Sequence, residues 1–131
     1  MNDAAGTPLS DDEMLARFVL KKEWLRKVDG TIKQDAFIPP KDLQLSVTRH
    51  AGISTGQLIE TGKTVAAETS LEFLGRADFK ARAVVKNALK AVAWPLAKNQ
   101  NHAHVIGWPA DKEARKTIAQ ELAAAAKFVL A

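Results

Sequence analysis

The clearest hydrophobic pattern in the chain is a strict alternation of apolar and polar residues over positions 43–48. Leu43, Leu45 and Val47 fall on one side of this segment, because successive side chains of a β-strand point to opposite faces. Residues 102–107 follow a related pattern, with a polar first half and an apolar second half. Both segments are therefore predicted to be strands that bury one face in a sheet.

The last segment has the spacing of an amphipathic helix. Pro109 suits the first turn. Apolar residues then recur three or four positions apart, at Ala114, Ile118, Leu122, Ala125 and Val129. The alanines at 123–126 add strong helix propensity, so the pattern predicts one continuous helix that reaches Val129.

Two earlier segments leave alternatives open. Ser10 and Glu13 have the form of a helix-capping box, and apolar residues over 14–20 have helical spacing, although their last part is also typical of a buried strand. Ser54 is predicted to cap a short helix that ends near Gly62, followed by a turn or a second short helix. Together the patterns predict an α+β fold, with a small, mainly antiparallel sheet packed against a C-terminal amphipathic helix.

Length and composition limit the organisation of the chain. Its 131 residues make one domain, and the small and polar residues 1–10 predict a flexible N-terminal tail ahead of a single domain over 11–131. The chain contains no cysteine, which excludes disulfides, a thiolate nucleophile and cysteine-based metal sites. We expect a cytoplasmic protein without a membrane partner, because no secretory leader or long apolar run is present.

The net charge of +4 is concentrated in residues 76–108, where six basic side chains stand against one acidic side chain. These basic residues are Arg76, Lys80, Arg82, Lys86, Lys90 and Lys98. A concentrated positive stretch can bind an anion or a nucleic acid. A solvated surface is the favoured interpretation of the charge alone, because no aromatic residues alternate with the basic ones as they do in single-strand-binding surfaces.

Polar residues near the two predicted strands provide the candidate chemistry. Ser46, Arg49, His50 and His102 are the candidate catalytic residues, with Arg49 holding a phosphate-bearing substrate and a histidine acting as acid or base. His102 and His104 would lie on one face of a strand and are weak metal candidates, since a metal site normally needs three or four ligands. The histidine-triad hydrolases are excluded, because position 106 is isoleucine.

Four short motifs resemble a group of small uncharacterised bacterial proteins: G-x-I at 30–32, AF-x-P at 36–39, LSV-x-R at 45–49 and HA-x-V-x-G at 102–107. The resemblance covers most of residues 15–127. It implies a shared fold without an established activity. The residues of interest within the shared motifs are Phe37, Ser46, Arg49 and His102.

We therefore expect a binding or accessory protein, rather than an enzyme, that engages a protein or a nucleic acid through the basic stretch and uses no cofactor. A small hydrolase or transferase and a histidine metal module remain the alternatives, and the sequence does not fix the oligomeric state.

Overall fold

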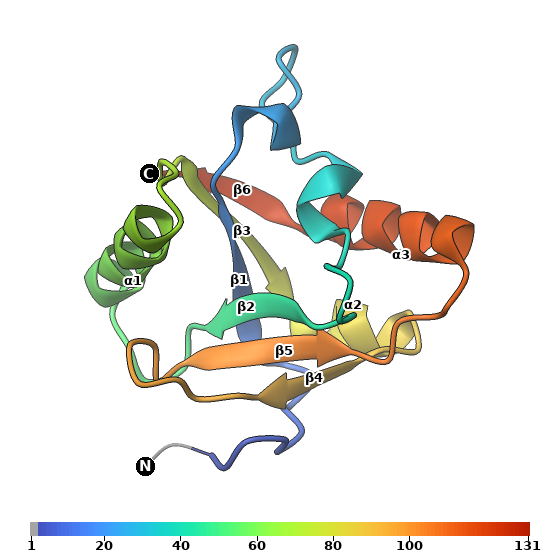
Figure 1. Cartoon of the computed structure of the whole chain (residues 1–131), viewed down its shortest axis with the longest axis horizontal. Coiled ribbons are helices and arrows are strands. Elements are labelled where there is room, and N and C mark those ends of the chain that lie inside the picture. The colour runs from blue at the N-terminus through green and yellow to red at the C-terminus, as the bar shows by residue number, and fades with distance from the viewer. Residues whose placement is uncertain (1–2) are drawn as a thin grey trace.

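A computed structural model describes residues 3–131 and contains one six-stranded antiparallel sheet (Figure 1). The strands are β1 (Met14–Val19), β2 (Leu45–Arg49), β3 (Gly75–Lys80), β4 (Lys90–Ala93), β5 (His102–Ile106) and β6 (Lys127–Leu130). They are hydrogen-bonded in the order β4-β5-β2-β1-β3-β6. The sheet and the C-terminal helix that packs on it confirm the predicted α+β fold.

The two faces of the sheet are covered differently. The helices are α1 (Thr55–Glu68), α2 (Ala81–Lys86) and α3 (Lys112–Ala125), with short 3-10 helices η1 (Lys22–Trp24) and η2 (Gln34–Phe37). Helix α3 and η2 cover the first face, where the main apolar core lies. Helix α1 lies on the second face, apart from α3 (Figure 1), and buries a smaller cluster of Ala16, Phe18 and Leu58.

The ambiguous segment after Ser10 is a strand. β1 pairs with β2 along one edge and with β3 along the other. Its apolar residues are buried on both faces of the sheet, with Leu15 and Val19 in the main core and Ala16 and Phe18 in the smaller cluster. Ser10 accepts a hydrogen bond from the backbone N–H of Asp12 in a turn rather than at a helix N-terminus. The capping-box pattern was therefore a wrong indicator of a helix at this place.

Helix α1 begins as predicted and ends later. Ser54 is its N-cap and forms a reciprocal capping box with Gln57. The helix continues through Gly62 to Glu68, so Gly62 does not end it. This glycine instead makes room for the ring of Phe73, which lies 2.5 Å from the position that a Cβ atom would occupy.

Helix α3 is shorter than predicted. Its N-cap is Asp111, whose carboxylate accepts from the N–H of Ala114, and the helix ends at Ala125. Leu122 is fully buried as predicted, but Ala125 is exposed and Val129 belongs to β6. The alanine run therefore forms only the last helical turn, and the β-branched and aromatic residues after it pair with β3.

Residues 6–9 are attached to the outer edge of β4. The N–H groups of Gly6 and Leu9 donate to β4 carbonyls at 2.7 and 3.0 Å, and Ala93 donates back to Thr7 at 2.8 Å. The segment predicted to be a free tail thus covers a sheet edge that would otherwise be unpaired. The folded domain begins before residue 11, and residues 1–2 of the predicted tail lie outside the described part of the chain.

Candidate functional site

Strands β1 and β2 separate after a short paired stretch. Their register contains Leu15↔Arg49 and Ala16↔Thr48, after which the two strands run in different directions (Figure 1). A pocket of about 490 Å³ lies in this fork, within the size range of ordinary ligand sites. It is lined by Arg17, Phe18, Leu20, Ser46, Val47, Thr48, Val65, Glu68, Leu96, Ala97, Lys98, Asn99 and His102.

Several parts of the fold form the lining of this fork pocket. β1 contributes Phe18, the residue after β1 is Leu20, and α1 contributes Val65, so these side chains form an apolar part of the lining. The loop between β4 and β5 contributes Leu96, Lys98 and Asn99, and the face of β2 and β5 contributes Ser46, Thr48 and His102. An apolar cavity with a few placed polar groups is the usual composition of a small-molecule site.

Arg17 is one of the two cations that line the fork pocket. Its Nε donates to the carbonyl of Ala36 at 2.8 Å and its Nη1 donates to the carbonyl of Ser46 at 3.0 Å. The guanidinium also lies over the ring of Trp24, 5.1 Å from the centroid. Arg17 thereby bridges η2 and β2 at the point where β1 and β2 have parted.

The charge of Arg17 has no carboxylate partner in residues 3–131. Burial disfavours the charged form and lowers the pKa of Arg17 to about 10, so the group remains protonated at neutral pH. An arginine has five N–H donors, and two of them are used by the carbonyls. No described side-chain nitrogen is both fully buried and unbonded, so the Nη2 atom, which has no partner in residues 3–131, is at least partly accessible. Arg17 also lines the fork pocket.

Two contacts join the remaining walls. Asn99 donates from Nδ2 to the buried Thr48 hydroxyl at 2.9 Å. Lys98 on the loop lies 3.5 Å from the carboxylate of Glu68 on α1, and both side chains are largely exposed. This exposed ion pair contributes little to stability, but it spans the opening between the loop and the helix.

His102 projects from β5 opposite Thr48. Its Nδ1 lies 2.9 Å from the carbonyl of Trp94; a carbonyl can only accept, so Nδ1 carries the hydrogen. Burial lowers the pKa of His102 below its usual 6.5, which leaves the ring neutral at pH 7 with a lone pair on Nε2. His104 packs against it edge to face, with centroids 4.8 Å apart, but does not line the fork pocket.

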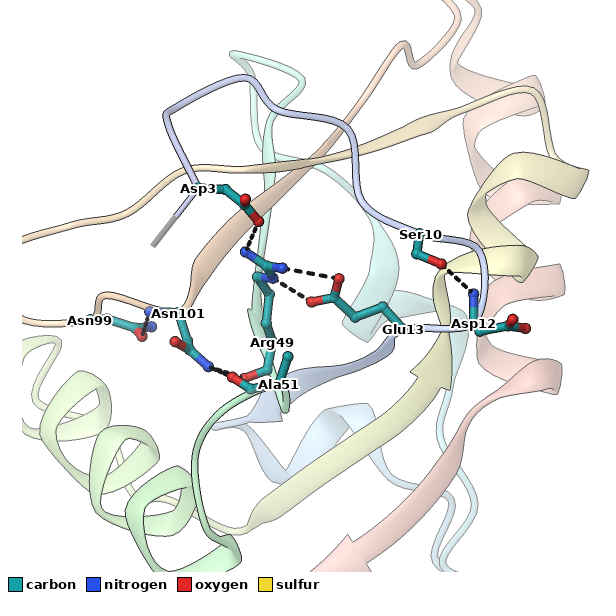
Figure 2. Close-up of polar contacts among 8 residues, drawn as sticks. All are labelled: Asp3, Ser10, Asp12, Glu13, Arg49, Ala51, Asn99 and Asn101. Atoms are coloured by element: carbon teal, nitrogen blue, oxygen red, sulfur yellow. Dashed lines mark hydrogen bonds and ion pairs between the residues drawn. The ribbon is translucent and has the colours of Figure 1, made fainter. Parts of the chain in front are cut away.

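Arg49 and His50 lie outside the fork pocket. Figure 2 shows Arg49 held between Asp3 and Glu13, with Nη1 2.9 Å from Asp3 and Nη2 3.1 Å from Glu13. His50 Nε2 instead lies 3.0 Å from Asp78. Of the candidate catalytic residues, the structure brings Ser46 and His102 to one pocket, and it does not bring Arg49 and His50 there.

The basic stretch is partly neutralised. Arg76 pairs with Asp78 at 3.1 Å and Arg82 with Asp12 at 2.5 Å, and Lys98 is paired with Glu68 as described. Lys80, Lys86 and Lys90 are the exposed basic residues of the 76–108 stretch that make no ion pair with the described residues.

Residues 3–131 contain neither a metal-binding cluster nor a membrane-spanning helix. No group of three histidine, cysteine or acidic side chains is placed to hold a metal, so His102 and His104 gain no third ligand there. None of the described helices is long and apolar enough to cross a membrane.

Arg17 was missed by sequence reasoning. It stands within an apolar run, and a single arginine at that place has no distinguishing motif. Its partners Ala36 and Ser46 are 19 and 29 residues away, so only the fold reveals its position.

Comparison with known proteins adds no assignment. No protein-family model matches the chain, and neither the curated proteins nor the solved structures gave a match. The resemblance to small bacterial proteins therefore stays a prediction.

Proposed function

We propose that this protein is a binding protein for a small amphipathic anion, held in the fork pocket. The observation that carries the proposal is Arg17, a part-buried cation without a carboxylate partner in residues 3–131 that lines a mainly apolar cavity. A carboxylate or phosphate ester on the ligand would supply the missing negative charge. The apolar part of the ligand would pack against Phe18, Leu20 and Val65.

Charge in the fork pocket supports the sign of the ligand. Arg17 and Lys98 stand against Glu68, so the lining has a net positive charge with neutral His102. An uncompensated cation in a partly desolvated place is costly, and a bound anion lowers that cost. An uncharged or cationic ligand would not lower the free-energy cost of the uncompensated cation.

Phenylacetate is a suitable probe, because it joins a carboxylate to an apolar ring of a size that the pocket accepts. Isothermal titration calorimetry should show saturable binding to the full chain. Arg17→Met should weaken it tenfold or more, since hydrogen bonds to a charged group contribute about 1.5–3 kcal/mol. Arg115→Met is the matched control, because Arg115 also donates to backbone carbonyls but does not line the fork pocket.

A second variant keeps the test valid if Arg17→Met fails to fold. Ser46 is exposed and lines the pocket, so Ser46→Phe should fill part of it without removing the cation. Binding that survives both substitutions unchanged would contradict the proposal.

A polyanion partner is the second candidate function, and three exposed lysines favour it. Lys80, Lys86 and Lys90 flank the two ends of α2 and the start of β4 and make no ion pair in the described residues. If they bind single-stranded nucleic acid, the affinity for an oligonucleotide should fall about tenfold or more between 50 and 200 mM salt, because binding releases counterions. A salt-independent affinity would contradict this candidate.

A further inference from the structure

A second set of hydrogen-bonding groups in the fork pocket lies apart from Arg17. Thr48 and His102 are directly opposite each other in the β2–β5 ladder, so their side chains lie on the same face of the sheet. Both line the pocket. They therefore form a small polar step beside the apolar walls.

The two groups at this step have complementary roles. The Thr48 oxygen already accepts from Asn99, which leaves its hydroxyl proton to be donated. His102 donates from Nδ1 to Trp94, which leaves Nε2 as an acceptor. Within residues 3–131 neither the Thr48 hydroxyl proton nor the His102 Nε2 lone pair has a hydrogen-bond partner. The Nε2 atom is also not fully buried, so it can meet a ligand.

One functional group satisfies both at once. A hydroxyl donates one hydrogen bond and accepts others, so a ligand hydroxyl can donate to His102 and accept from Thr48. A carboxylate or an ether oxygen has no hydrogen for Nε2. An ammonium group has no lone pair for the Thr48 proton.

The spacing between this step and the arginine can be worked out from the strand. Arg17 bonds to the carbonyl of Ser46, which is two residues before Thr48 on β2. Each residue of a strand advances about 3.3 Å, so the two ends of the site are separated by about 7 Å along β2. The side chains near both ends are apolar on the β1 and α1 walls, which suits a hydrocarbon spacer.

We propose that the fork pocket takes a hydroxy acid, with the acid group on Arg17 and a hydroxyl about 7 Å away between His102 and Thr48. This inference rests on the proposed anion-binding function and specifies its ligand class. A rigid aromatic or short aliphatic spacer would set the distance between the two groups.

The test compares 4-hydroxyphenylacetate with phenylacetate on the full chain, by isothermal titration calorimetry at pH 7. These probes differ only in a hydroxyl at the far end of the ring. The hydroxylated probe should bind about fivefold more tightly, as expected for one additional net hydrogen bond. His102→Phe should abolish this preference, so that the two probes bind the variant with equal affinity.

Two further variants complete the design. Thr48→Val keeps the shape of the side chain and removes its donor, so it should reduce the preference if His102→Phe fails to fold. His50→Gln is the control, because His50 lies on Asp78 away from the pocket, and it should retain the preference.

Each outcome separates the two claims. Equal affinities for both probes, with both lost in Arg17→Met, would overturn the hydroxyl assignment and leave the anion site. A preference that survives in both His102→Phe and Thr48→Val would also overturn it. Failure of both probes to bind would overturn the hydroxyl assignment together with the proposed function.

Discussion

Replacing Gly62 by alanine tests how helix α1 is docked on the sheet. A Cβ atom at this position would lie 2.5 Å from Cε1 of Phe73 and 2.9 Å from two other ring atoms. The ring cannot move freely, because it packs edge to face on Phe18 with centroids 5.7 Å apart. Overpacking of this kind costs about 1–3 kcal/mol, and the gain in helix propensity offsets up to about 1 kcal/mol.

The expected net effect is a loss of about 1–2 kcal/mol in the free energy of unfolding. Gly56→Ala is the matched control in the same helix, since only the Ser54 side chain lies near its Cβ position, at 3.8 Å. It should stabilise by up to about 1 kcal/mol. Urea denaturation followed by circular dichroism measures both. If Gly62→Ala proved as stable as Gly56→Ala, Phe73 would not lie over Gly62 and the α1 wall of the fork pocket would be misplaced.

Three further predictions concern the core, a histidine and an ion pair. Leu122→Ala should cost about 2–5 kcal/mol by urea denaturation, because the side chain is fully buried under the sheet; a change below about 1 kcal/mol would contradict its place in the core. Because burial lowers the pKa of His102, the unfolded chain binds its proton more readily, so stability should be complete above about pH 7 and fall as the pH drops below about 6.5. His102→Phe should make that fall shallower, and an unchanged pH profile of unfolding would contradict the burial. Glu13→Gln should cost about 1–3 kcal/mol, since it removes the carboxylate held by Arg49 in a part-buried place, and a melting temperature equal to that of the unmodified chain would count against this pair.

The local sequence pattern predicted those helices and strands that bury only one face in the core. Strand β2 shows the alternation expected when one face meets the core, with Leu45 and Val47 buried. Helix α3 shows an apolar stripe around Leu122 for the same reason. Strand β1 lacks alternation, because it lies inside the sheet with apolar contacts on both faces, and such a run does not distinguish a buried strand from a helix.

The ends of elements depended on distant contacts. Gly62 is typical of a helix end, but Phe73 packs over it from beyond the helix. Val129 continues the apolar spacing of α3, yet it pairs with Arg76 in the sheet. In both cases a partner far along the chain decides the local structure.

The site was predicted only in part. Ser46 and His102 were candidates because they are polar residues on the two predicted strands, and both line the fork pocket. Arg49 was a candidate for anion binding, but Asp3 and Glu13 already occupy it. Arg17 lines the pocket because β1 and β2 separate beside it, and the spacing of residues along the sequence does not reveal this separation.

The most direct measurement of the central claim is an NMR titration of the Arg17 side chain. The Nε–H resonance of Arg17 should shift as phenylacetate is added to the full chain at pH 7, and the shift should saturate. The backbone amide of His102, across the same pocket, should follow with the same dissociation constant. Phenylacetate that binds without moving the Arg17 resonance, or that fails to bind, would contradict an anion site in the fork between β1 and β2.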